Sequence, residues 1–463
     1  MKRPWLAWAA WCLVVFGLFN CSATHREAWA TGRWLQAGGF EVSLRTALRA
    51  LRAAVTDDGD INRYFAYSNA VLGRPYQSRF VKPLDAWRAP APPSIPQIDL
   101  EDPDVTPPVR PSGRMVPYRD FSVEYPPGLF LLTLPVALIA RDMDSYFRLF
   151  SVFMGGLLTL ALLICVRMAR EIAPQKAGSL VWWATGAALA LGTVLVRRYD
   201  AAIALFLCLL VWGMMARRPV PAGLGFGIGV MAKGVPLLIA PIPLLYWSSR
   251  RRWREMALAT AAALGVGLAV GLPFLRIAGA HMLDLLRYHA ERPLQVESTG
   301  AALLMVGRFF APASAAASQG FGSTNVVGSW DGPLRLLAGA LPWIALLAVF
   351  GWTVRALRRP GGDGMRVIIR AICAALVFQM TLGKVFSPQY LTWIFPLALL
   401  ASITDGRAQL GLLLATLGPT QIIFPFCYHF GLTRAAHPAL GVLVLIRNGF
   451  LTAWAVRGLR APS

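Results

Sequence analysis

The boundary between the polar and the apolar parts of this chain is the stretch Asp120-Phe121-Ser122-Val123-Glu124-Tyr125-Pro126-Pro127-Gly128. A long polar segment precedes it, and the first of a series of apolar runs follows it. Proline lacks a backbone N–H and restricts the residue before it, so the Pro-Pro-Gly step cannot carry a helix in from the polar side. The chain is therefore predicted to turn at this point, at the surface of a membrane.

The composition also indicates a membrane. Hydrophobic residues make up 56% of the 463 residues and charged residues 15%, and the mean hydropathy is +0.53. These values are too apolar for a soluble globular protein and predict an all-α polytopic membrane protein. The net charge of +22 comes from short basic clusters between apolar runs. Such clusters indicate membrane topology and contact with anionic lipid, and they do not form a surface for nucleic acid.

The chain is predicted to form a single membrane domain over residues 1–463. Residues 1–22 are predicted to be an uncleaved signal-anchor span, and residues 23–127 a large outer loop. Residues 128–456 are predicted to form a transmembrane bundle with a second outer loop at 279–333. The apolar runs predict about twelve membrane helices, although several are shorter than the ~20 residues that a perpendicular helix needs.

The first outer loop has internal structure. Residues 43–56 carry leucines on one face and arginines on another, which predicts an amphipathic helix at the membrane interface. Residues 61–72 are predicted to form a second short helix that begins at an Asp cap. The proline-rich segment 83–111 is predicted to be an extended surface loop without a fold of its own.

One apolar run decides the topology. Leu129 to Ala140 contains about a dozen apolar residues and Pro135, fewer than the ~17 that a span usually requires. If this run is re-entrant, every basic cluster lies on the cytoplasmic side. If it spans, the clusters at 167–176 and 217–218 move outside. In the re-entrant arrangement, five polar segments meet on the outer face: 23–127, 197–200, 233–236, 279–333 and 384–390.

These segments carry cations and carboxylates at the ends of apolar runs, where charge is costly and tends to be functional or paired. Arginine and lysine suit a lipid-linked phosphate, and a carboxylate suits a general base for a hydroxyl group. Structural alternatives exist: a pair between Arg198 and Asp200, a pair between Glu297 and Arg292, Lys233 extending to the interface, and Asp60 as a helix cap. The cations are Arg198, Lys233, Arg292 and Lys384, and the carboxylates are Asp60, Glu124, Asp200 and Glu297.

The ordered set of motifs resembles a known group, the polyprenol-phosphate-sugar-dependent glycosyltransferases of the membrane-embedded type C superfamily. The most similar member is glycosyltransferase family 87, which includes bacterial mannosyltransferases. A long proline-rich insertion between Tyr76 and Glu124 departs from the family pattern, so the identity of the acceptor stays open. The matching stretches are Asp60 to Tyr64, Gly73-Arg74-Pro75-Tyr76, Glu124-Tyr125-Pro126-Pro127-Gly128, Arg198-Tyr199-Asp200, the Gly-rich 223–229 with Lys233 and Pro236, 292–298 and 387–393.

The resemblance implies an inverting transfer of a sugar, with mannose as the default, from a polyprenyl phosphate to a lipid or glycan acceptor. It implies Asp60 as the base, with Asp58 as the alternative, and no metal or other cofactor. It further implies a bacterial inner membrane with the site on the periplasmic or extracellular face. Arg198, Lys233, Arg292 and Lys384 are then candidates to bind the donor phosphate, and Tyr64, Glu124, Asp200, Glu297 and Gln389 to bind or orient the sugar.

Other functions remain as alternatives. A transporter or flippase for a lipid-linked sugar or another anion would use the same outer cations, but alternating access predicts internal repeats. The two halves of the chain show no convincing self-similarity. A protein O-mannosyltransferase or an oligosaccharyltransferase-like enzyme would place paired acids in the first loop, for which Asp57 and Asp58 are candidates. A non-catalytic member of the family is a further alternative.

Overall fold

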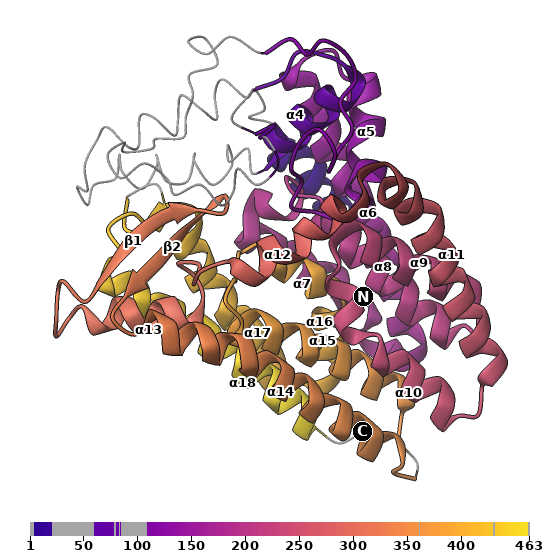
Figure 1. Cartoon of the computed structure of the whole chain (residues 1–463). Coiled ribbons are helices and arrows are strands. Elements are labelled where there is room, and N and C mark those ends of the chain that lie inside the picture. The colour runs from indigo at the N-terminus through magenta and orange to yellow at the C-terminus, as the bar shows by residue number, and fades with distance from the viewer. Residues whose placement is uncertain are drawn as a thin grey trace.

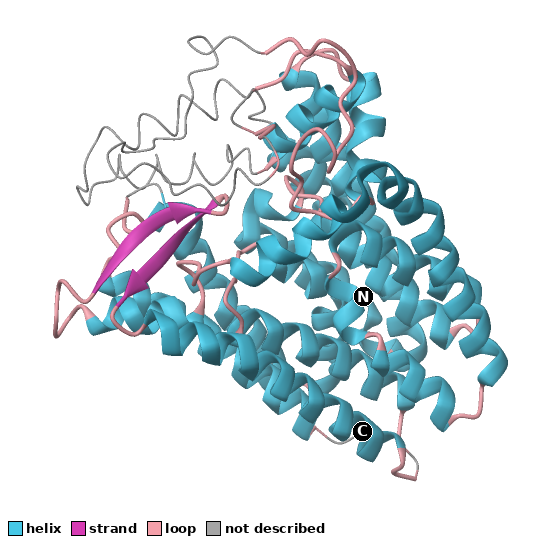
Figure 2. Cartoon of the chain, viewed as in Figure 1, coloured by secondary structure: helices cyan, strands magenta, loops and turns pink. Residues whose placement is uncertain are grey.

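The computed structural model describes residues 4–20, 60–77, 80–82, 84, 109–360, 362–428 and 431–461. Helices dominate this part of the chain (Figure 1, Figure 2). The predicted helix at 43–56, Asp57 and Asp58 lie outside the described residues. The α-helices are α1 (Pro4–Cys12), α4 (Ile61–Leu72), α5 (Leu129–Ile139), α6 (Met143–Ile172), α7 (Pro174–Leu191), α8 (Asp200–Met215), α9 (Pro219–Lys233), α10 (Pro241–Ser249), α11 (Trp253–Ala278), α12 (Asp284–Glu291), α13 (Thr299–Gly307), α14 (Asp331–Leu357), α15 (Gly364–Leu382), α16 (Tyr390–Asp405), α17 (Arg407–Gln421) and α18 (Pro438–Arg460). Shorter 3₁₀ and π turns are η1 (Leu13–Gly17), η2 (Leu18–Asn20), η4 (Gly192–Leu195), η5 (Val235–Ile239), η6 (Gly279–Leu283) and η7 (Ile422–Cys427), and the strands are β1 (Ala315–Gly320) and β2 (Ser323–Gly328).

The chain is an integral membrane protein. Among the described residues, seven helical segments are long and apolar enough to cross a membrane. They are Met143–Ile172, Pro174–Leu195, Trp253–Glu291, Asp331–Leu357, Gly364–Leu382, Arg407–Cys427 and Pro438–Arg460. Five further apolar helical segments have only 10–17 residues. The expected count of about twelve spans is therefore not confirmed.

Two of the short apolar helices form the centre of the bundle. Every residue of α16 from Leu391 to Ile403 is buried, and α8 is nearly as enclosed. They pack against each other and against α6, α7, α9, α15 and α17. Because other helices surround them, their N-terminal ends carry Asp200 and Tyr390 into the interior of the protein.

The N-terminal helix is part of the same packing. The indole N–H of Trp11, which is fully buried, donates to the Thr159 hydroxyl at 2.9 Å. The guanidinium of Arg197 donates to the carbonyl of Phe19 at 2.9 Å. The retained signal anchor stays a prediction, and these two bonds are what its removal would break.

The short helix α5 lies beside α4 in Figure 1 and packs against α4, α6 and α9. It has 11 residues, about half of the ~20 that cross the hydrocarbon core at right angles. Asp142 then caps α6, accepting a hydrogen bond from the backbone N–H of Ser145. The re-entrant arrangement and the side of the membrane remain predictions.

Gly128, the last residue of the boundary stretch, makes a close backbone contact. Its N–H donates to the carbonyl of Met231 at 2.7 Å, two residues before Lys233. A Cβ atom at Gly128 would lie 2.4 Å from the backbone carbon of Met231, a separation that real side chains do not adopt. The Pro-Pro-Gly step therefore places the start of α5 directly against the end of α9.

Gly128→Ala is expected to push α9 away and to destabilise the protein by about 1–3 kcal/mol, as overpacking does. Sugar transfer is expected to fall by about a hundredfold, because a small displacement of a positioned group has effects of that size. Thermal unfolding in detergent and transfer rates measure the two effects. Gly332→Ala, near the start of α14 with open space around it, is the control. Equal behaviour of the two variants would contradict the packing argument.

The second outer loop is not structureless and not wholly helical. It contains α12, α13 and the antiparallel hairpin of β1 and β2, in which Gly320 pairs with Ser323. The turn residues Phe321 and Gly322 have φ values of 54° and 63°, as in a two-residue type I′ turn. The all-α prediction was wrong for this segment. The dipeptide Phe321-Gly322 between two short polar runs was the available signal, but Phe is an unusual residue at that turn position.

Both ends of the proline-rich insertion are held together. Tyr76 and Val109 exchange two backbone hydrogen bonds, at 3.0 and 2.9 Å. Residues 76 and 109 are therefore adjacent, and the insertion into the family pattern stays a prediction. Most of segment 83–111 lies outside the described residues.

Candidate active site

Helix α4 begins and ends where the sequence predicts, and Asp60 is its N-cap residue. The Asp60 side chain makes no capping hydrogen bond to the described first turn of the helix. Its Oδ2 instead lies 3.5 Å from Tyr64 Oη, which donates, and 3.7 Å from Arg198 Nε. The carboxylate is 26% exposed. These contacts do not support the capping alternative, and they leave Asp60 accessible to a substrate.

Tyr64 is a fixed hydrogen-bond donor to Asp60. Its side chain is buried, and burial, reinforced by the charge of Asp60, raises the pKa of the phenol well above its usual value. The hydroxyl therefore stays protonated throughout the physiological pH range. It can orient the Asp60 carboxylate but cannot compete with it as a base.

Lys233 and Asp200 form a second charged group. Lys233 Nζ donates to Asp200 Oδ1 at 2.5 Å, and Trp393 Nε1 donates to the same oxygen. The ammonium also lies 4.8, 5.2 and 5.1 Å from the ring centres of Tyr199, Tyr390 and Trp393. Such rings stabilise a desolvated cation. Lys233 is only 11% exposed, so it does not extend to the interface, and Asp200 pairs with it and not with Arg198.

A layer of tyrosine rings joins the two groups. Tyr199 lies 5.4 Å from Tyr64 and 5.3 Å from Tyr125, centre to centre, with edge-to-face geometry. Tyr199 also faces Lys233. Edge-to-face contacts of this kind are favourable and rigid. Asp60, Arg198, Asp200 and Lys233 therefore belong to one continuous site.

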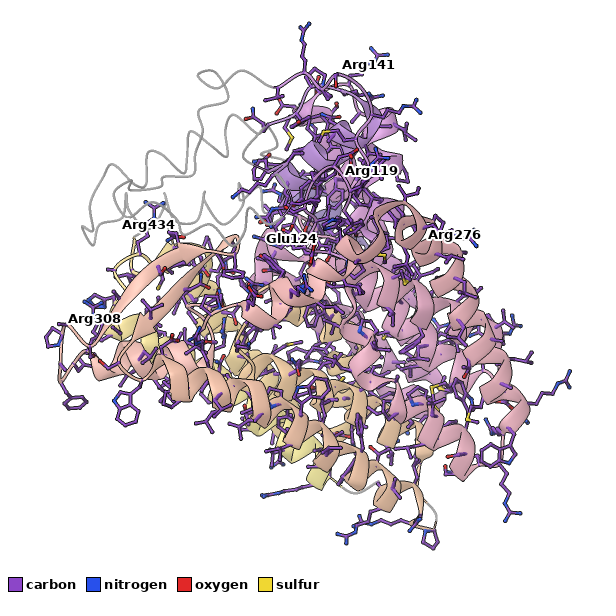
Figure 3. All side chains as sticks on the ribbon, in the orientation of Figure 1. Arg119, Glu124, Arg141, Arg276, Arg308 and Arg434 are labelled. Carbon is purple, nitrogen blue, oxygen red and sulfur yellow. The ribbon has the colours of Figure 1, made fainter. Side chains whose placement is uncertain are left out.

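Glu124 joins this site through α4. It forms an ion pair with Arg63 and accepts a hydrogen bond from Tyr67 Oη at 2.6 Å. Figure 3 places Glu124 between the α4 region and α12. His289, in α12, lies with its Nε2 3.1 Å from the backbone carbonyl oxygen of Glu124. At this distance an N–H on Nε2 donates a hydrogen bond to that carbonyl. Sequence reasoning missed Arg63, although its position three residues after Asp60 puts both on one face of a helix.

The remaining predicted cations, Arg292 and Lys384, both contact residues of the 279–333 loop. Arg292 Nη2 donates to the Ser323 hydroxyl at 3.0 Å, and Lys384 Nζ donates to the Ala290 carbonyl at 2.7 Å. Burial, with a smaller contribution from Arg335, lowers the pKa of Lys384. Gln389 is the N-cap residue of α16, directly before Tyr390.

Glu297 does not join the group. Its carboxylate forms an ion pair with Arg447 and accepts a hydrogen bond from Tyr428 Oη at 2.8 Å. Both members of the pair are fully buried. The alternative pair with Arg292 is also not formed, since Arg292 contacts Ser323. The predicted sugar-binding role is therefore not supported, and Glu297 instead anchors the 292–298 segment to α18.

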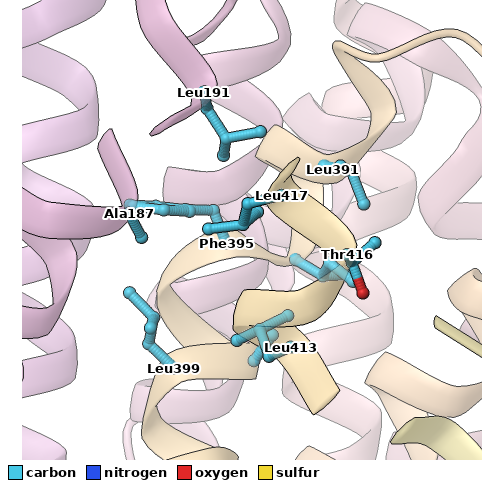
Figure 4. A pocket seen from close by; sticks show the side chains of 10 residues that line it. Ala187, Leu191, Leu391, Phe395, Leu399, Leu413, Thr416 and Leu417 are labelled. Carbon is cyan, nitrogen blue, oxygen red and sulfur yellow. The ribbon is translucent and has the colours of Figure 1, made fainter. Parts of the chain in front are cut away.

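Two other features were considered as sites. Figure 4 shows a small pocket between α7, α16 and α17, whose lining is apolar except for Thr416, so it offers no group for catalysis. Among the described residues, no group of three or more His, Cys, Asp or Glu side chains could hold a metal ion.

The site combines a partly exposed carboxylate, Asp60, with two cations at helix ends, Arg198 and Lys233, of which Lys233 is paired with Asp200 and surrounded by three aromatic rings. The model of glycosyltransferase family 87 matches residues 123–388, more than half of the chain. The chain therefore belongs to glycosyltransferase family 87, and the prediction of a glycosyltransferase from this polyprenyl-phosphate-sugar-dependent group is confirmed. The matched range includes Glu124, Arg198, Asp200, Lys233, Arg292, Glu297 and Lys384, whereas Asp60, Tyr64 and Gln389 lie outside it.

The chain is similar to a solved structure, that of ArnT from Cupriavidus metallidurans bound to undecaprenyl phosphate. The sequence identity is 14% and the TM-score 0.43, and the match covers 94% of this chain and 76% of that chain. No curated protein matches the chain.

Proposed function

We propose that this protein transfers a sugar, with inversion, from a polyprenyl-phosphate-linked donor to a hydroxyl of a lipid or glycan acceptor. The sugar is mannose, and the site faces the periplasm or the exterior from a bacterial inner membrane. The observation that carries the proposal is the position of the Asp60 carboxylate, held by Tyr64 and Arg198 and joined by tyrosine rings to the Lys233 ammonium.

In the proposed step, Asp60 accepts the proton of the acceptor hydroxyl, and the oxygen attacks the anomeric carbon of the donor sugar. A new C–O bond forms on the face opposite the leaving group. The bond between the anomeric carbon and the phosphate oxygen breaks, and its electron pair stays on the polyprenyl phosphate. Arg198 and Lys233 stabilise the negative charge that develops there, with Arg292 and Lys384 as further candidates. Cations of this chain suffice for that neutralisation, so the proposal includes no cofactor.

Asp200 acts through Lys233 in this scheme. The ammonium has three N–H donors, and Asp200 takes one of them. The three surrounding aromatic rings stabilise the ammonium through its charge. Unlike a second carboxylate, they do not take up its other two N–H groups in hydrogen bonds. Lys233 is therefore positioned to donate to a phosphate while staying charged in a largely buried site.

Lys233→Met is expected to weaken donor binding by about tenfold to a hundredfold, the usual effect of losing a hydrogen bond to a charged group. Undecaprenyl phosphate binding to the purified protein, followed by tryptophan fluorescence, measures this. Lys176→Met, which removes an exposed charge near the start of α7, is the control. Because Lys233→Met leaves the buried Asp200 without its partner, thermal unfolding shows whether this variant is folded, and Lys233→Arg restores the charge. Unchanged donor affinity in Lys233→Met would argue against the phosphate role.

The proposed function is tested with purified protein in nanodiscs, supplied with undecaprenyl-phosphate-mannose and with the corresponding arabinose, glucose and galactose donors. Transfer to octyl glycosides and to membrane glycolipids is followed, and proton NMR gives the configuration of the new linkage. Transfer from the mannose donor with inversion is the expected result. Absence of transfer from every donor, together with donor movement across sealed vesicles, would instead establish the transporter alternative.

A further inference from the structure

The tip of the β1–β2 hairpin contacts the helix that carries Asp60. A Cβ atom built on Gly322 would lie 3.0 Å from Nη2 of Arg63, so the guanidinium covers this glycine. The same guanidinium pairs with Glu124. Arg63, which lies about one helical turn after Asp60, therefore links the hairpin tip to the carboxylate of Glu124.

The tip is also held from the other side. Tyr288 Oη donates to the Phe321 carbonyl at 2.5 Å, and the two rings lie 5.4 Å apart. Ser323 accepts a hydrogen bond from Arg292. Phe321 keeps a positive φ, which is costly for a bulky residue and persists only where surrounding contacts hold it. These contacts place a strained turn at a defined position beside the site.

Helix α4 packs on α5 and α6, and the hairpin tip contacts α4 through Arg63. Lys233 ends α9 and Asp200 begins α8, and in the proposed function Lys233 binds the donor phosphate. Neither α4 nor the hairpin belongs to a segment that could span the membrane. Arg63 and Glu124 retain 18% and 13% exposure, and Gly322 is exposed. This wall therefore faces the second substrate.

We propose that the hairpin tip Phe321-Gly322-Ser323, together with Arg63, forms the acceptor-side wall of the site, and that Arg63 and Gly322 determine specificity for a sugar-bearing acceptor. A guanidinium fixed beside a carboxylate presents donors and acceptors in one plane, which suits neighbouring hydroxyls of a sugar ring. Because Gly322 has no Cβ atom, the hairpin tip places no side chain against the Arg63 guanidinium, where a Cβ would lie 3.0 Å from Nη2. This inference rests on the proposed function.

The test compares Gly322→Asn with Gly279→Asn. Asparagine tolerates positive φ better than most residues, so neither substitution acts mainly through the backbone. Gly279 has a φ of 58° with no neighbouring atom within 4 Å, whereas Gly322 faces Arg63. The apparent KM values for octyl α-mannoside and for undecaprenyl-phosphate-mannose are measured separately, together with donor hydrolysis, in which water is the acceptor. Thermal unfolding establishes that each variant is folded.

Gly322→Asn is expected to raise the acceptor KM by about tenfold, or about 1.4 kcal/mol, with donor KM and donor hydrolysis changed less than about twofold. Gly279→Asn is expected to match the wild type. Arg63→Lys keeps the charge but loses the planar fork, and is expected to raise the same KM. The double variant Arg63→Lys, Gly322→Asn is expected to be non-additive, because both residues form one wall.

Three results would overturn the inference. An unchanged acceptor KM in Gly322→Asn, with the wild type active, overturns it and leaves the proposed function intact. An equal rise in donor and acceptor KM does the same, because it describes general damage to the site. A wild-type protein without transfer from any donor overturns the proposed function and this inference together.

Discussion

Asp60→Asn is expected to lower sugar transfer by about 10² to 10⁴-fold, the range for loss of a positioned general base. Asparagine keeps the shape of the side chain and its contacts with Tyr64 and Arg198, but it cannot take up the proton of the acceptor hydroxyl. Donor affinity is expected to stay within about twofold, because the Lys233 group is unchanged and the lost charge is on the acceptor side. Initial transfer rates and undecaprenyl phosphate binding measure the two quantities.

Asp284→Asn is the matched control for this experiment. Asp284 begins α12 in the 279–333 loop and pairs with Arg287 and His281, whose side chains are exposed. Its loss is expected to leave transfer nearly unchanged, as with most surface ion pairs. If Asp60→Asn were fully active, Asp60 would not be the base, and Asp58 would be the next residue to substitute. Loss of donor binding in Asp60→Asn would also count against a role confined to proton transfer.

Arg447→Met is expected to destabilise the protein by about 3–5 kcal/mol, because it leaves the buried Glu297 carboxylate without its partner. Arg447 also donates to the Glu297 carbonyl at 2.9 Å and lies 3.9 Å from the centre of the Phe386 ring. The variant therefore loosens the 292–298 segment and the loop before α16 together. Chemical denaturation in mixed micelles measures the apparent free energy of unfolding.

Two further variants are needed to interpret the stability change in Arg447→Met. Arg335→Met removes a half-exposed partner of Asp331 within α14, and is expected to change stability by less than about 1 kcal/mol. Combining Arg447→Met with Glu297→Leu is expected to recover much of the lost stability, since an apolar pair replaces an ion pair at little cost. If Glu297→Leu alone abolished donor binding in a stably folded protein, the anchoring role assigned to Glu297 would be wrong.

The local features of the site were predictable because they depend on neighbouring residues. Helix α4 follows from its apolar spacing and from Gly73, which ends it with a φ of 72°. The four-residue spacing of Asp60 and Tyr64 puts both side chains on one face of that helix. The Pro-Pro-Gly turn at 126–128 follows from backbone restrictions alone. No sequence pattern, however, gives the distance from Gly128 to Met231, because the two meet only when α5 packs on α9.

The pairing of charges depended on tertiary structure. Asp200 has Arg198 two residues away but pairs with Lys233, since α8 starts at Asp200 and its first turn faces the end of α9. Glu297 has Arg292 nearby but pairs with Arg447, 150 residues along the chain. A buried carboxylate pairs with the cation that packing brings to it in the interior, where desolvation makes an unpaired charge costly.

The amino-acid sequence by itself determined that the chain is a membrane protein, that it belongs to the group of family 87, and that polar residues gather at the ends of apolar helices. The membrane class and the position of the polar residues follow from composition and from the spacing of apolar runs, whereas the family was indicated by the resemblance of an ordered set of motifs and shown by the family model. Only the tertiary structure decided which cation serves which carboxylate, that Arg63 belongs to the site, and that a hairpin lies against α4. The physical reason is that these contacts join segments far apart in the chain, and helix packing sets their distances.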